Sequence, residues 1–100
     1  MIVHWTGLAR THVRQINAYL TEHSPNLLES QLALIVAAVN GLRHFPGKGR
    51  PGRVDGTREL IVLGTPFIVA YTEQRSRVAV VAVIHSSRRW PKSFEIEQEG

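Results

Sequence analysis

Two stretches in the first half of the chain place hydrophobic residues every three or four positions, the period of a helix with one buried stripe. The pattern predicts one helix over residues 8–23 and a second that begins at Pro25 and ends near Leu42. Ser24 is the expected N-cap of the second helix, and Pro25 fits its first position, where the missing N–H costs nothing. The short connection predicts an antiparallel hairpin. The stripes are Ala9, Val13, Ile16 and Leu20, followed by Leu28, Leu32, Ile35, Val39 and Leu42.

Short runs of β-branched and aromatic residues flank this hairpin. Residues 2–5 are β-prone, and a lone strand of this length needs a partner later in the chain. Residues 58–63, 67–73 and 77–85 are rich in valine and isoleucine and are joined by turn-length connectors, which predicts an antiparallel meander. The predicted fold class is therefore α+β, with a short N-terminal strand and a two-helix hairpin packed on a C-terminal antiparallel β-meander.

The last predicted strand is apolar on both faces, so something must cover each side of it. The helical hairpin covers one side. A partner protein is one way to cover the other side, and a curved sheet that wraps its own side chains is the alternative. By the two-residue period of a strand, His85 at its end shares a face with Val83 and Val81.

Length and composition limit the class of protein. One hundred residues make one domain, predicted over residues 1–92 with an acidic tail at 93–100. The absence of cysteine excludes disulfides, thiolate nucleophiles and Cys-ligated metals. The five histidines lack metal-ligand spacing, so neither a metal nor a cofactor is expected. Because no secretory leader or membrane-length apolar run is apparent, we expect a cytoplasmic protein.

The net charge of +4 is unevenly distributed along the chain. Residues 1–42 are neutral, residues 43–92 carry ten basic and three acidic groups, and residues 93–100 carry three glutamates. Ten of the twelve cations are arginine, whose planar guanidinium suits phosphate and carboxylate. The pattern predicts an acidic partner, either nucleic acid or an acidic protein surface, with a solubilising face as the alternative.

Residues 46–57 form a loop rich in glycine and proline, which is predicted to be either functional or an ordered clasp. Gly47, Gly49 and Gly52 spell GxGxxG within it. A dinucleotide site needs a strand before this motif and a helix after it, and here the order is helix, loop, strand. We therefore reject a dinucleotide site.

Candidate site residues lie in two places in the basic half. Arg58 follows the loop, and His85 ends the last strand at what the meander makes the opposite end of the sheet. A neutral His85 beside guanidiniums that hold a phosphate would suit RNA cleavage. A strand-end histidine bonded to the backbone is the simpler alternative. The full set is Arg50, Arg53, Arg58, His85, Arg88, Arg89 and Trp90.

Three segments carry a resemblance to a known family. They are GRPGRVDGTRELIV (49–62), GTPFIVAY (64–71) and VAVVAVIHSSRRWP (78–91), preceded by IVHWTGLA and the predicted hairpin. In order and spacing the chain resembles the RelE/ParE superfamily of type II toxins, most closely its ParE-like branch. The resemblance spans nearly the whole chain and implies the fold already predicted from the hydrophobic pattern.

The superfamily holds two activities, and the resemblance implies one of them here. RelE-like members cut mRNA on the ribosome with cationic side chains on the sheet and a late acid–base residue. ParE-like members lack those cations and poison DNA gyrase. Residues 58–63 read RELIVL, with apolar residues in place of sheet cations, which favours the ParE-like activity.

The resemblance therefore implies a gyrase inhibitor that a cognate antitoxin protein neutralises. Its expected docking surface is formed by residues 43–58 and 85–92 and contains the seven candidate residues above. The alternative is a ribosome-dependent endoribonuclease with His85 as the acid–base group and Arg58, Arg88 or Arg89 on phosphate. A second alternative is a small RNA-binding module.

Overall fold

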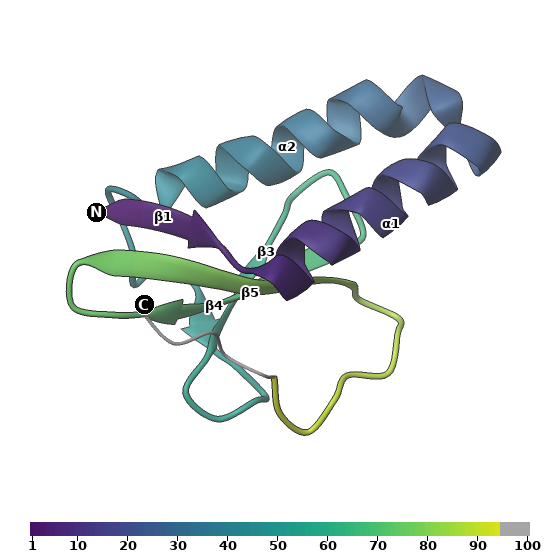
Figure 1. Cartoon of the computed structure of the whole chain (residues 1–100). Coiled ribbons are helices and arrows are strands. Elements are labelled where there is room, and N and C mark those ends of the chain that lie inside the picture. Colours follow the sequence, from purple (N-terminus) through teal and green to yellow (C-terminus); the bar gives the residue numbers. More distant parts are fainter. Residues whose placement is uncertain (95–100) are drawn as a thin grey trace.

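The computed structural model describes residues 1–94 as a five-stranded sheet with both helices on one face (Figure 1). The strand order is β1-β5-β4-β3-β2. The predicted α+β class is confirmed. The elements are β1 (Ile2–Trp5), α1 (Gly7–His23), a 3₁₀ turn (Pro25–Leu27), α2 (Leu28–Gly41), β2 (Arg50–Pro51), β3 (Arg58–Ile61), β4 (Phe67–Glu73) and β5 (Arg77–His85).

The N-terminal strand finds its partner in the last strand. β1 lies parallel to β5, from Ile2 opposite Arg77 to Trp5 opposite Val80. The chain then leaves the sheet, because Thr6 donates its N–H to the Val80 carbonyl and its hydroxyl caps α1. Helix α1 therefore starts on the edge of β5 and covers the part of that edge which β1 does not reach.

The two helices pack on the sheet as an antiparallel hairpin. Each buries the predicted stripe, with Ile16 and Leu20 of α1 and Ile35 and Val39 of α2 in the main core. Neither helix in residues 1–94 is long and apolar enough to cross a membrane.

The predicted serine cap of the second helix is wrong. Ser24 instead ends α1, donating its N–H to the Leu20 carbonyl at 2.8 Å, and its hydroxyl makes no cap hydrogen bond. The 3₁₀ turn Pro25–Leu27 separates Ser24 from α2. A serine in this position is one turn too early to reach the free N–H groups of the second helix.

A β-bulge in β5 changes which residues of this strand face the helices. The register passes from Ala70 opposite Ala82 to Tyr71 opposite Val80, which leaves Val81 without a partner in β4. Val81 and Ala82 consequently lie on the same face, away from the helices. On each side of the bulge the two-residue period continues, but in opposite phase.

Because of the bulge, one part of the predicted facing of His85 is wrong. His85 pairs with Phe67 and contacts its ring edge-on at 5.7 Å between centroids. Phe67 and Val83 both belong to the core beneath the helices, so the face shared by His85 and Val83 is confirmed. Val81 lies on the other face, because the sequence period assumes an uninterrupted strand.

The second face of the sheet is covered by the chain itself. The segment after β5 turns back beneath the sheet toward the loop before β3, in yellow and teal in Figure 1. Val54 of the loop and Phe94 are buried in one cluster with Ala82 and Ile84, and Trp90 packs against it. Neither predicted covering describes this arrangement, because a loop and the segment after β5 bury these side chains, and not the curvature of the sheet itself.

Candidate functional site

A buried carboxylate organises the loop of residues 46–57. Glu59 of β3 is 3% exposed, and its side chain receives Arg50 Nη2 at 3.0 Å and Arg53 Nε at 3.0 Å. The backbone N–H of Arg53 donates to the same carboxylate at 2.8 Å. We call Glu59 with residues 46–57 the clasp. Two of the predicted docking arginines are therefore engaged in holding the fold.

The electrostatics of Glu59 match this structural role. Burial by itself would raise the pKa of Glu59, but the hydrogen bonds from Arg53 and Arg50 outweigh it and hold the pKa below its ordinary value. The carboxylate is therefore ionised at neutral pH and fully hydrogen-bonded, the condition under which a buried charge is tolerated.

A buried tyrosine anchors the start of the clasp. The Tyr71 hydroxyl donates to the Pro46 carbonyl at 2.6 Å and accepts the Gly49 N–H at 2.8 Å. A Cβ atom on Gly49 would lie 2.7 Å from that hydroxyl, so only glycine fits. Close packing therefore requires the glycine at position 49, and the predicted ordered clasp is what the loop forms.

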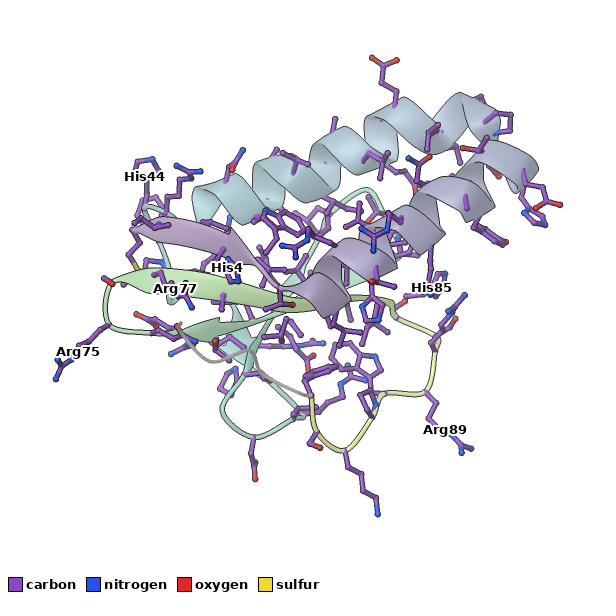
Figure 2. The ribbon with its side chains drawn as sticks, viewed as in Figure 1. His4, His44, Arg75, Arg77, His85 and Arg89 are labelled. Carbon is purple, nitrogen blue, oxygen red and sulfur yellow. The ribbon has the colours of Figure 1, made fainter. Side chains whose placement is uncertain are left out.

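The structure separates Arg58 from His85, as predicted. Arg58 pairs with Tyr71 in the sheet, whereas His85 pairs with Phe67 at the far end of β4. Figure 2 shows the same separation along β5, with Arg75 and Arg77 at one end and His85 at the other. Arg58 donates to the Gly49 carbonyl at 2.9 Å and lies 3.8 Å from Glu73.

The two predicted docking segments do meet. The Arg53 guanidinium lies over the Trp90 ring, 4.0 Å from its centroid, and Trp90 contacts Phe94 edge-on. A cation over an indole face is attracted by the ring quadrupole. Residues 43–58 and 85–92, distant in sequence, therefore share one surface.

A cleft of about 650 Å³ lies between α1 and the end of β5. Its wall includes His12 of α1, His85 of β5 and the following Ser87, Arg88 and Arg89. No aspartate or glutamate of residues 1–94 lines it. Arg88 and Arg89 are exposed, and neither forms an ion pair with a described residue. Figure 2 shows Arg89 extending away from the fold.

Both histidines in this cleft use Nδ1 as an acceptor. His12 Nδ1 accepts the Val83 N–H at 3.2 Å, on the part of β5 that β1 does not reach. His85 Nδ1 accepts the Ser87 N–H at 3.1 Å and lies 2.7 Å from the Ser87 hydroxyl. An imidazole whose Nδ1 accepts an N–H carries its ring proton on Nε2. Burial, and secondarily the Arg88 charge, lowers the pKa of His12.

Sequence reasoning missed three residues of these sites. Glu59 had one visible signal, a lone acid at the start of a β-run just after a basic loop. His12 lies four residues from both Leu8 and Ile16 and so shares the buried side of α1, but nothing in its spacing points to β5. Gln31 of α2, which also lines the cleft, had no signal.

The described chain offers no evident metal centre. Within residues 1–94, no three or more histidine, aspartate or glutamate side chains are grouped so that they could hold a metal ion.

Comparisons with known proteins agree on the family. The chain is 34% identical over 90 residues to the toxin candidate Y4kP of Sinorhizobium fredii, covering 90% of this chain and 93% of that protein. Its fold resembles a chain of the chromosomal ParDE system from P. aeruginosa, with a TM-score of 0.74 and 24% identity over 85% of this chain and 95% of that one. Residues 3–90 match the family described as ParE toxin of type II toxin-antitoxin system, parDE. The chain therefore belongs to the ParE toxin family.

Proposed function

We propose that this toxin arrests growth by poisoning DNA gyrase and that a cognate antitoxin protein neutralises it by direct binding. Family membership supports the choice of target, as does the composition of β3. In β3, Leu60 is buried in the core and Ile61 is half exposed, where an RNA-cleaving relative would carry cations. If gyrase is the target, the toxin acts in the cytoplasm.

The separation of Arg58 from His85 favours gyrase poisoning over RNA cleavage. Arg58 lies at the far end of β4 from His85 and is engaged with Gly49 and Glu73. His85 therefore has only Arg88 and Arg89 nearby among the arginines predicted to hold phosphate. A pentacovalent phosphate needs several preorganised donors around it, so this arrangement favours docking over catalysis.

The candidate residues of the proposed docking surface differ in whether their side chains are exposed or engaged in contacts within the fold. Arg88 and Arg89 are exposed and form no ion pair within residues 1–94, so both can meet an acidic partner. Arg50, Arg53 and Arg58 hold the clasp, and Arg53 also positions Trp90. We infer that the segment 85–92 makes the charged contacts and that the clasp shapes the surface beside it.

The test is a gyrase assay with purified protein. We expect loss of supercoiling and accumulation of cleavage complexes, and the double variant Arg88→Ala/Arg89→Ala should need about tenfold more protein for the same effect. Arg75→Ala, an exposed arginine at the other end of β5, is the matched control and should behave as wild type. Unchanged supercoiling and cleavage-complex levels, or arrested cells that show mRNA cleavage without DNA damage, would refute the proposal.

An apolar groove between the helices supports antitoxin binding. It has a volume of about 420 Å³, is lined by Trp5, Val13 and Val36 among others, and has Arg10 and Arg14 at its wall. Val36 is 49% exposed although it belongs to the apolar side of α2. An amphipathic helix with acidic flanking residues would satisfy both the apolar floor and the arginines.

Co-expression with the neighbouring open reading frame tests this interaction. We expect the two proteins to co-purify and growth to recover. Val36→Glu should prevent co-purification and leave the gyrase assay unchanged, whereas the exposed polar site Asn40→Glu on the same helix should have no effect. Co-purification that survives Val36→Glu would place the antitoxin elsewhere.

A further inference from the structure

We propose that the cleft between α1 and β5 binds a nucleotide, either free or as a unit of a nucleic acid strand, with its phosphate at Ser87, Arg88 and Arg89 and its base toward Gln31. This goes beyond the proposed function, because it requires neither gyrase nor an antitoxin. It rests on two chemically different groups of residues that line one cleft.

The residues after β5 give part of the cleft lining a character that suits an anion. Arg88 and Arg89 bring two guanidiniums, and no carboxylate among the described lining residues neutralises them. His12 and His85 both have Nδ1 occupied as an acceptor, which leaves Nε2–H as the ring donor of each. A cleft that offers both guanidinium and imidazole donors suits a tetrahedral phosphate better than a planar carboxylate, which two guanidinium donors already satisfy.

Residues of the two helices and of β4 give another part of the lining an apolar character, with one unmet acceptor. Ile16, Leu20 and Phe67 form much of its wall. The Gln31 side-chain oxygen is buried there and has no hydrogen-bond partner among the described residues. A buried acceptor of this kind favours a ligand that brings an N–H donor. The exocyclic amine of a nucleobase provides such a donor on a flat apolar body.

The dimensions are consistent with one nucleotide. A volume of about 650 Å³ lies within the range of small-molecule sites, roughly 300–1,000 Å³. A ligand that pairs with the cationic residues and also donates to Gln31 combines a phosphate with an amine-bearing aromatic ring. Adenosine monophosphate is therefore the probe of choice, with inorganic phosphate and adenosine as its two halves.

Isothermal titration and imidazole proton NMR on the purified chain test the site. We expect adenosine monophosphate to bind more tightly than either half and to shift the signals of His12 and His85. Arg88→Ala/Arg89→Ala should weaken binding about tenfold, and Arg75→Ala should leave it unchanged. Gln31→Leu should bring the affinity for adenosine monophosphate close to that for phosphate.

A single-stranded oligonucleotide forms the second arm of the experiment. Tighter binding of the strand than of the mononucleotide, lost in the double arginine variant, would identify nucleic acid as the natural source. Circular dichroism of each variant shows whether it is folded, so a loss of binding can be assigned to the site.

Three results would overturn the proposal. The first is no binding of either nucleotide form at millimolar concentration. The second is binding that the double arginine variant retains. The third is equal affinity for adenosine monophosphate and inorganic phosphate with no effect of Gln31→Leu, which would leave an anion site without base recognition. None of these results depends on gyrase inhibition, so this proposal and the proposed function fail independently.

Discussion

The clasp and the cleft use the same residue type for opposite purposes. In the clasp, Arg50 and Arg53 converge on the buried carboxylate of Glu59. In the cleft, Arg88 and Arg89 face solvent, with no carboxylate among the described lining residues. The difference lies in whether the fold supplies a counter-charge. An arginine near a predicted site is therefore informative about partners only after its intramolecular contacts are known.

The comparison also separates stability from binding. Removing a clasp residue leaves buried polar groups without partners, which costs free energy of folding. Removing a cleft arginine leaves nothing buried and unpaired. Substitutions in the two regions should therefore move different observables.

Replacing Glu59 by leucine should have the largest effect. The change leaves the Arg53 N–H without its acceptor and two guanidiniums without their counter-charge, and we expect a loss of about 3 kcal/mol. The measurement is chemical denaturation. Glu73→Gln is the control, because the Arg58 to Glu73 pair is long and exposed and should contribute less than about 1 kcal/mol. Equal losses for both variants would show that Glu59 is not the centre of the clasp.

Replacing Tyr71 by phenylalanine should come second. The ring stays in the core, but the Pro46 carbonyl and the Gly49 N–H lose their partner, at a cost of about 2 kcal/mol. Hydrogen exchange at Gly49 should accelerate, while exchange at Val83, which donates to His12, stays slow. If exchange accelerated equally at both positions, the loop would not be an independently anchored unit.

Mild acid should reduce the stability of the fold by a smaller amount, and it acts through His12 in the cleft. The folded-state pKa of His12 lies below its ordinary value of 6.5, so the unfolded chain binds more protons between those values. The His12 contribution to stability is therefore complete above pH 6.5 and is lost as the pH falls toward the lowered pKa.

Replacing His12 by asparagine isolates this effect. Asparagine keeps an acceptor near the position of Nδ1 but does not titrate, so the stability curve should flatten just below pH 6.5. Denaturation midpoints measured across this range give the comparison. Glu59, with a pKa held below its ordinary value of 4.5, adds a separate loss below that pH which the asparagine variant retains. An unaltered curve between pH 6.5 and 5 would argue against a buried neutral His12.

The double variant Arg88→Ala/Arg89→Ala should have the smallest effect on folding, within about 0.5 kcal/mol of wild type. Arg53→Ala should cost about 1–2 kcal/mol, because it removes hydrogen bonds to Glu59 and the contact with Trp90. Thermal denaturation of the two variants side by side measures this contrast. If the cleft variant were the less stable one, the roles assigned to the two regions would be reversed.

Much of the fold could be predicted because its local patterns agree with each other. The bounds of β1, β4 and β5 were predicted to the residue, since β-branched runs and turn residues mark them. The placement of Arg58 and His85 at opposite ends of the sheet was also predicted, because the direction of the strands alone determines it. The facing of Val81 did not, because the bulge depends on how β5 packs against β4 and leaves no mark in a run of valines.

The candidate site was less predictable for a related reason. Arg53 and Arg58 were correctly located in the loop and in β3, whereas Arg50, predicted in the loop, lies in the short strand β2. The attachment of these arginines to Glu59, Gly49 and Glu73 depends on distances that no sequence spacing fixes. The docking residues remain a prediction for the gyrase assay to test.

The sequence by itself determined the order of the elements, the hairpin, the meander and the concentration of positive charge in the second half, since these depend on local period and composition. Tertiary structure alone decided which arginines pair with carboxylates among residues 1–94. It placed Glu59 under the loop and brought His12 across to the end of β5. The physical reason is that charge availability depends on contacts between distant segments, which packing sets and local patterns do not encode.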